Sequence, residues 1–294
     1  MSNEQPIPAH IAFLRAGNQL ISASSYTYAE LADIYNQARV DYIVPMPMNG
    51  KRLQEYVVAY DISLSGSAVA LTQEGLPCGV GMLGMRDGRG WITRLGVIPE
   101  RRKLHAGQAI MEYLINAAIE QNAHLVQLEV IVGNDPARHL FDKLGFVQTR
   151  ELLVIRRPPN PLTPNLSYDS LMPITIEGSE IPALLAGRQD IPSWIEETPS
   201  LLNAGNLRGL KLVSDTGEWG WIIFQRSPFQ LTHFVLSYND DWLAKALLYH
   251  VHKEYPMQDT KIENVAVNDH LWQIYQQMGY IEVFRRTEMF LHLK

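Results

Sequence analysis

The stretch from Trp91 to Phe146 constrains the fold most, because it combines strand-like and helical patterns in one continuous run. It reads as strand, basic loop, helix, strand and capped helix. Behind the loop, Ile110, Leu114 and Ala118 recur at the spacing of one helix face. This order of elements predicts an α/β fold in which helices flank a twisted mixed β-sheet.

The basic loop holds three cations, Arg101, Arg102 and Lys103, directly before the long helix. Positive charges at a helix N-terminus oppose the positive end of the helix dipole and normally cost stability. A bound anion reverses this effect, because free backbone N–H groups and basic side chains then share one target. The loop therefore predicts a phosphate-bearing ligand. The plainer alternative is a solvated charge cluster.

The length and charge of the chain exclude several classes of protein. With 294 residues and 46% hydrophobic residues, two domains with real cores are expected. Residues 158–294 carry 10 Lys and Arg against 16 Asp and Glu, which argues against a nucleic-acid partner. The single cysteine, Cys78, excludes an intrachain disulfide and a cysteine metal cluster, and no histidine spacing predicts a metal site. Without a signal-like start or a long apolar run, we expect a cytoplasmic protein with no membrane partner.

Local patterns predict the elements around this stretch. Asp135 offers an N-cap with Pro136 at the first helical position, and Gly145 supplies the helix stop. Hydrophobic spacing and turn residues predict further elements. The predicted helices span residues 28–37, about 51–59 and about 105–121, and the predicted strands span residues 67–72, 78–85, 91–97, 125–132 and 151–156.

The second half of the chain repeats the layout of the first. Residues 158–167, PPNPLTPNLS, form a proline-rich linker. We therefore expect one domain at residues 1–157, with its core at 19–157, and a second at 168–294. At a constant offset of 134, Glu129, Asn134 and Gly145 stand opposite Glu263, Asn268 and Gly279, which indicates a duplication.

The same offset predicts that the second copy has lost the anion site. It places Leu236 opposite Arg102, and Asp241 opposite Gly107. The copy lacks the cations of the basic loop and carries an acid instead. It should not bind the same anion.

Three blocks of the first half together resemble the GNAT superfamily of N-acetyltransferases. They are Val97-Ile98-Pro99, the loop from Arg102 to Gly107, and the segment from Asn134 to Phe146. The resemblance covers about residues 19–157, while the second half matches in layout and in the last block. It implies two tandem GNAT-like domains, of which the second is degenerate.

The resemblance also implies a site for acetyl-CoA as cosubstrate. The backbone of residues 95–97 would hold the pantetheine arm, and the N–H groups of residues 103–108 would hold the pyrophosphate. The chain departs from the family pattern at His105, where a glycine is usual, and at Phe141, where a tyrosine that protonates the leaving sulfur is usual. The implied cofactor-binding residues are Leu95, Gly96, Val97, Arg102, Lys103, Leu104, His105, Ala106, Gly107, Gln108, Asn134 and Phe141.

Several of these residues also admit a structural interpretation. Glu129 interrupts an apolar strand, so it is either the general base or the partner of an arginine such as Arg94. Asn134 either bonds the pantetheine amides or makes a turn before the next helix. Gly107 can also serve helix–strand packing, and Phe141 can be a core residue instead of a site residue.

The expected activity is transfer of an acetyl or short acyl group from acetyl-CoA to a primary amine by direct attack. A small-molecule amine is the favoured acceptor, and a protein lysine or N-terminus is a further possibility. An acyl-CoA-binding sensor without catalysis is the alternative. The second domain would shape the acceptor site or support assembly, as a monomer or homodimer.

Overall fold

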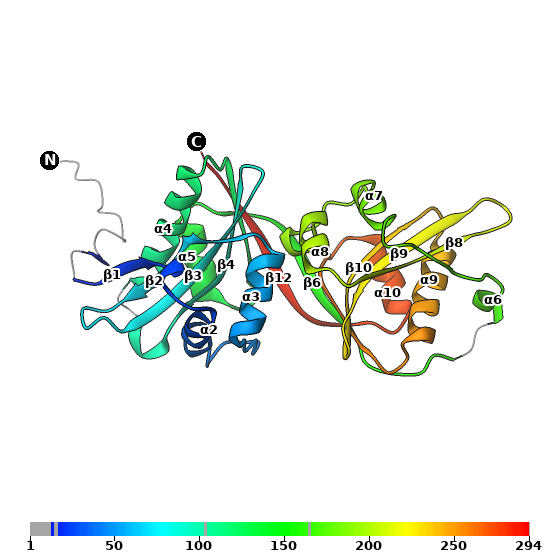
Figure 1. Ribbon diagram of the computed structural model, residues 1–294, viewed down its shortest axis with the longest axis horizontal. Helices are drawn as coiled ribbons and strands as arrows, with labels where there is room; N and C mark the ends of the chain where they lie inside the picture. Colours follow the sequence, from blue (N-terminus) through cyan, green and yellow to red (C-terminus); the bar gives the residue numbers. More distant parts are fainter. Residues whose placement is uncertain (1–12, 15–16, 103–104, 164–165, 294) are drawn as a thin grey trace. The chain divides into compact units, whose positions relative to one another are not determined.

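A computed structural model gives the structure of residues 13–14, 17–102, 105–163 and 166–293. The chain divides into two compact units (Figure 1). Unit 1 comprises residues 1–149 and 288–294, and unit 2 comprises residues 150–287. Each unit is described by itself. No helix of the described segments has the length and apolar character that crossing a membrane requires.

Unit 1 is a mixed sheet with strand order β1-β2-β3-β4-β5-β12. Its first four strands pair antiparallel, and β4 pairs parallel with β5. The predicted α/β class with a mixed sheet is therefore confirmed. In chain order its elements are β1 (Gln19–Ser22), η1 (Ala23–Ser25), α2 (Tyr28–Gln37), α3 (Gly50–Ala59), β2 (Ile62–Leu71), β3 (Pro77–Arg86), β4 (Arg89–Val97), η2 (Pro99–Arg101), α4 (Ala106–Glu120), β5 (Leu125–Ile131), α5 (Asp135–Lys143) and the ends of β6 (Val147–Arg157) and β12 (Ile281–His292).

The helices of unit 1 begin at residues that satisfy free N–H groups. Thr27 and Glu30 form a reciprocal capping box at α2, and Asn49 caps α3. At α5 the predicted N-cap Asp135 is wrong. The cap is Asn134, whose side chain accepts from Ala137 N, and Asp135 is the first helical residue, where its charge favours the helix dipole.

Glycines let helices approach both faces of this sheet. A Cβ atom at Gly81 would lie 2.6 Å from Cγ2 of Ile110 on α4. A Cβ atom at Gly96 would lie 2.9 Å from Cβ of Ala38, just after α2. Since Gly96 pairs with Val80, the residue before Gly81, these two contacts lie on opposite faces of the sheet. The N-terminus of α4 is thereby held beside the end of β4.

A bulge opens the sheet between β4 and β5. Arg94 has a left-handed backbone with φ 54°, and the register with β3 shifts between Val80 and Met82. The parallel pairing of β4 with β5 covers residues 89–91 of β4 and 125–127 of β5. Residues 95–97 of β4 lie beyond this ladder and are not among the residues of β4 that pair with β5.

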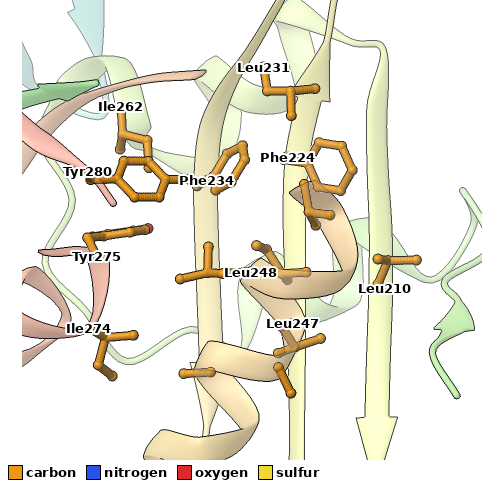
Figure 2. Close-up of a cluster of buried hydrophobic side chains, with 14 of the residues drawn as sticks. Leu210, Phe224, Leu231, Phe234, Leu247, Leu248, Ile262, Ile274, Tyr275 and Tyr280 are labelled. Atoms are coloured by element: carbon orange, nitrogen blue, oxygen red, sulfur yellow. The ribbon is translucent and has the colours of Figure 1, made fainter. Parts of the chain in front are cut away.

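Unit 2 repeats the element order of unit 1, with strand order β6-β11-β10-β9-β8-β7. Its core packs Phe224 and Phe234 of the sheet against Leu247 and Leu248 of α9 and Tyr275 of α10 (Figure 2). Besides parts of β6 and β12, its elements are α6 (Leu166–Asp169), β7 (Ile174–Thr175), α7 (Ile181–Ala186), η3 (Trp194–Glu196), α8 (Thr198–Ala204), β8 (Leu207–Val213), β9 (Trp219–Arg226), β10 (Gln230–Tyr238), α9 (Asp241–Glu254), β11 (Asp259–Ala266) and α10 (His270–Gln277).

The structure divides the chain elsewhere than at the proline-rich segment. The strand that follows α5, β6, pairs with β11 of unit 2. The strand that follows α10, β12, ends beside β5 of unit 1. Residues 158–167 consequently lie within unit 2. Prolines end a strand because they lack the N–H donor, but the contacts of the strands decide where a compact unit ends.

Candidate functional site

A cavity of about 440 Å³ lies in unit 1 where the N-terminus of α4 meets the open edge of β4. Four segments line it: the α2–α3 loop, the end of β4, the loop before α4 with the first turn of α4, and the start of α5. Eight of the predicted cofactor residues are among its lining residues, namely Leu95, Gly96, Val97, Arg102, His105, Ala106, Gly107 and Asn134. The cavity is large enough for part of an elongated ligand.

The first turn of α4 presents backbone donors to this cavity. His105 is the N-cap and takes the left-handed conformation, with φ 58° and ψ 13°, that a glycine would adopt there. Ala109 N donates to His105 O at 2.9 Å, and the N–H groups of residues 106–108 precede this bond at the N-terminus, where an α-helix supplies no acceptor from its own turns. These donors at the positive end of the helix dipole suit a phosphate.

The left-handed backbone of His105 should lower the free energy of unfolding, and a substitution can test this. We expect His105→Gly to raise the free energy of unfolding by about 0.5–1 kcal/mol, because the relief of left-handed strain exceeds the added chain entropy. Denaturant unfolding measures this. Asn122→Gly is the matched control, since Asn122 also has φ 60° but asparagine tolerates that region better. A loss of stability in His105→Gly would show that the ring itself stabilises the loop.

Arg102 is the cation of the basic loop that the structure describes at the cavity. Its two terminal nitrogens donate to the two carboxylate oxygens of Asp41 at 2.6 and 2.7 Å, and its Nε donates to Val97 O at 3.2 Å. Arg101 instead donates to Pro77 O, away from the cavity lining. Lys103 and Leu104, two of the predicted cofactor residues, lie outside the described residues.

Gln108 and Phe141, also predicted to bind the cofactor, do not line the cavity. The side chain of Gln108 donates to Glu112 at 2.8 Å and accepts from Lys143 at 2.9 Å, so its polar atoms already have partners within unit 1. Phe141 is buried in the core, with its ring 6.1 Å from that of Phe146. The position where the family places an acid thus holds a packing residue here.

Asn134 connects two walls of the cavity. Its Oδ1 accepts from Ala137 N at 3.4 Å, which makes the cap of α5 described above. Its Nδ2 donates to the hydroxyl of Tyr42 in the α2–α3 loop at 3.3 Å. The turn interpretation of Asn134 is therefore confirmed, while a contact with the pantetheine arm stays a prediction.

Glu129 lies on β5, outside the residues that line the cavity. Its Oε2 accepts from Nε1 of Trp91 at 2.8 Å. The predicted arginine partner, Arg94, donates to the hydroxyl of Tyr35 at 2.9 Å and stacks on the ring of Tyr56 at 4.3 Å. The general-base role of Glu129 stays a prediction.

Sequence reasoning missed the α2–α3 loop, residues 38–49. Arg39, Asp41, Tyr42 and Ile43 of this loop line the cavity. The sequence signals only a connection between two helices, and nothing in it links Asp41 to an arginine 61 residues later. Tertiary packing of Ala38 against Gly96 brings the loop to the site.

The described residues of unit 2 contain no loop comparable to the basic loop of unit 1. In unit 1, eight residues (98–105) connect β4 to α4, whereas two residues (239–240) connect β10 to α9. The N-terminus of α9 is capped by its own acid, since Asp240 accepts from Trp242 N at 2.8 Å. The predicted pairing of Leu236 with Arg102 is wrong, because Leu236 lies in strand β10 and the shorter loop breaks the constant offset.

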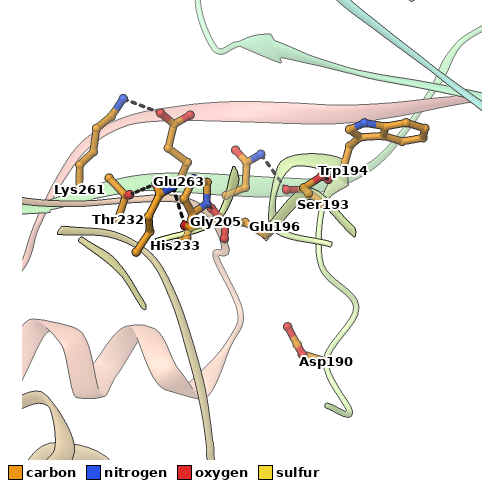
Figure 3. Close-up of polar contacts among 12 residues, drawn as sticks. Asp190, Ser193, Trp194, Glu196, Gly205, Thr232, His233, Lys261 and Glu263 are labelled. Carbon is orange, nitrogen blue, oxygen red and sulfur yellow. Dashed lines mark hydrogen bonds and ion pairs between the residues drawn. The ribbon is translucent and has the colours of Figure 1, made fainter. Parts of the chain in front are cut away.

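Paired polar side chains occupy the bulge region of unit 2 (Figure 3). His233 has φ 55° in the bulge of β10, and its Nδ1 lies 3.0 Å from Oε1 of Glu196. Glu263 of β11 forms ion pairs with Lys261 at 2.5 Å and with Arg286 at 2.7 Å. Burial alone would raise the pKa of Glu263, but the two cations lower it well below its usual value.

Tyr275, which stands at the position of Phe141 in the second copy, lies in the core of unit 2 (Figure 2). Burial raises the pKa of its hydroxyl well above the usual value. Within the described part of the chain this hydroxyl has no hydrogen-bond partner. It contributes packing to unit 2. Over the same described residues, no three His, Cys, Asp or Glu side chains are grouped as a metal site would require.

Comparisons with known proteins agree with this geometry. Residues 31–146 match the model of the Acetyltransferase (GNAT) family. A 65-residue stretch is 37% identical to an N-alpha-acetyltransferase of Sulfurisphaera tokodaii and covers 22% of this chain and 39% of that relative. The match therefore spans well under half of the curated relative.

Solved structures share the fold over both units. The GCN5-related N-acetyltransferase from Sphaerobacter thermophilus superposes with a TM-score of 0.69 at 15% identity and covers 94% of this chain and 95% of that one. A tandem GNAT protein from the clavulanic acid biosynthesis pathway gives a TM-score of 0.63 at 13% identity and covers 94% and 98%. At such identities the likeness shows the fold. Residues 31–146 thus match the Acetyltransferase (GNAT) family, and the two units share the fold of the solved tandem GNAT protein.

Proposed function

We propose that unit 1 transfers an acetyl or other short acyl group from acetyl-CoA to a primary amine. The observation that supports this most is the convergence of the first turn of α4, Arg102 and the end of strand β4 on one cavity. The donors of residues 106–108 would bind the diphosphate of the cosubstrate. The edge of residues 95–97 would take its amide-bearing arm as an added strand.

The reaction is a direct transfer. The amine nitrogen forms a bond to the thioester carbonyl carbon, the carbon–sulfur bond breaks, coenzyme A leaves as the thiolate, and the ammonium formed loses a proton to solvent or base. A backbone N–H of β4 would polarise the carbonyl, and alignment of the two reactants would supply most of the acceleration. A thiolate needs little protonation to leave, so the core position of Phe141 is compatible with the chemistry.

Two observations bear on the acceptor. The cavity wall formed by the α2–α3 loop includes the apolar side chain of Ile43, which is 55% exposed. We propose a small amine with an apolar portion as the acceptor. The curated relative is an N-alpha-acetyltransferase, which favours the α-amino group of a protein as the second candidate.

The test combines binding and turnover with the full chain. Calorimetric titration with coenzyme A should show one site, and amines in a panel that includes peptide N-termini should release free thiol from acetyl-CoA. Absence of coenzyme A binding would overturn the proposal. Binding without turnover on any amine would replace the enzyme by an acyl-CoA sensor.

Glu129 gives a prediction about this reaction. Because its carboxylate accepts from Trp91, we expect Glu129→Gln, which keeps an acceptor oxygen, to retain kcat within about threefold, less than a general base contributes. The rate of thiol release measures this. A fall of more than about a hundredfold together with loss of the acidic limb of the pH profile would assign the base role to Glu129.

A further inference from the structure

We propose that Asp41 competes with the diphosphate of the cosubstrate for Arg102, so that binding of acyl-CoA unfastens the α2–α3 loop from the anion loop. The inference rests on the proposed function of unit 1. It assigns to Asp41 a role that lowers cofactor affinity and couples the cofactor site to the neighbouring wall of the cavity.

The competing contact lies inside the cavity. Asp41 and Arg102 both line it, and the pair is bidentate, at 2.6 and 2.7 Å. This fork-to-fork geometry is the one that a guanidinium also offers to phosphate oxygens. The face of Arg102 that would receive a phosphate is therefore the face that Asp41 holds.

The charge of Asp41 acts in the same direction. Its hydrogen bonds from Arg102 hold the pKa of the carboxyl below its usual range, so the group is an anion at neutral pH. An anion that lines the same cavity as the first turn of α4 repels an incoming diphosphate. The side chains of Arg102 and Asp41 are 46% and 49% exposed, and exposed pairs contribute little stability, so a diphosphate with higher charge displaces the carboxylate readily.

The other contacts of the α2–α3 loop show which part of it would become mobile when Arg102 leaves Asp41 for the diphosphate. Asn36 holds the far end through hydrogen bonds of 2.7 and 2.9 Å with the backbone of Met48. Near the start of the loop, Arg39 stacks on the ring of Tyr42 at 3.3 Å, and the Tyr42 hydroxyl accepts from Nδ2 of Asn134 at 3.3 Å. The ion pair of Arg102 with Asp41 connects the α2–α3 loop to the basic loop that contains Arg102. Its loss would loosen the segment at residues 40–43, which then keeps the bond from Asn134 to Tyr42, while the far end stays anchored.

The functional consequence is an order of binding. Ile43 and Tyr42 form part of the cavity wall next to the strand edge. Before the cosubstrate binds, the Arg102–Asp41 pair holds the α2–α3 loop in place. After it binds, the loop can move, and the acceptor amine then gains access to the cavity. The cosubstrate would therefore bind first and the acceptor second. The coupling works through one exchange of partners at Arg102, which is a discrete two-state contact.

The experiment compares Asp41→Asn with the native chain by calorimetric titration with coenzyme A. We expect the variant to bind about three- to tenfold more tightly, because one competing anion has been removed. Glu55→Gln is the matched control, since it removes an equal charge from an exposed ion pair on α3 with Lys51, outside the cavity lining. It should leave the affinity unchanged.

Hydrogen exchange of residues 40–43 is the second measurement. Without coenzyme A, these amides should exchange faster in Asp41→Asn than in the native chain and in Glu55→Gln. If Asp41 merely orients Arg102 for the phosphate, Asp41→Asn binds coenzyme A equally or more weakly, and the proposal is overturned. Tighter binding with unchanged exchange would overturn the release of the loop. If the native chain binds no coenzyme A, the proposed function fails instead.

Discussion

Replacing Arg102 with glutamate should weaken binding of coenzyme A to unit 1 by about 10- to 100-fold, the range for loss of one charge-assisted contact. The substitution removes the guanidinium that lines the cavity and places a second carboxylate next to Asp41. Two adjacent anions would then face the N–H groups of residues 106–108. Repulsion of the diphosphate adds to the lost contact, so the effect should reach the upper end of this range.

Calorimetric titration at fixed ionic strength measures this change, because salt screens the exposed charges. Arg52→Glu is the matched control. It makes the same reversal of charge at an exposed residue in the first turn of α3, outside the cavity lining, where an acid suits the helix dipole. Equal weakening by both variants would mean that net charge, and not a site at Arg102, governs the affinity.

Acidification should destabilise the chain through one buried histidine of unit 2. His252 is fully buried, and its Nε2 lies 2.8 Å from the hydroxyl of Tyr280. Burial and the nearby charge of Arg157 lower the pKa of His252 to about 3. The unfolded chain, with a histidine pKa near 6.5, therefore binds a proton between about pH 6.5 and 3 that the folded chain does not. The free energy of unfolding should fall over this window by on the order of 4 kcal/mol.

His233 acts with the opposite sign at higher pH. Burial lowers the pKa of His233, but the carboxylate of Glu196 at 3.0 Å outweighs burial, and the pKa is raised. The folded chain then holds a proton above pH 6.5 that the unfolded chain has lost. This stabilisation is fully present below about pH 6.5 and is lost as the pH rises through the folded pKa. The two histidines together predict maximal stability near the unfolded histidine pKa.

Denaturant unfolding between pH 4 and 8 measures the acid destabilisation that we assign to His252. His252→Phe removes the titrating group but keeps an aromatic ring beside Phe234. Its stability should depend less steeply on pH below 6.5 than that of the native chain. His139→Gln, at an exposed position on α5, should leave the slope unchanged. An equal slope in His252→Phe and the native chain would contradict the assignment of acid sensitivity to His252.

Elements whose signals are local were predictable from the sequence. The helix at residues 28–37 and the long helix after the basic loop occur within one residue of their predicted bounds. His105 stands where the family pattern has a glycine, and its backbone takes the left-handed conformation that glycine adopts most readily. Hydrophobic period and caps act within a few residues, so they can be read without knowing the rest of the fold.

Contacts between distant residues were decided by the tertiary structure. The pair of Asp41 with Arg102 and the return of β12 to unit 1 depend on which surfaces pack together. The anion site depends both on local sequence patterns and on tertiary contacts. The sequence itself determined its basic loop and the start of α4, because dipole and charge act locally. Only the packed sheet, with its bulge at Arg94 and its close approach at Gly96, decided which other segments complete the cavity, since periodic patterns carry no information on that pairing.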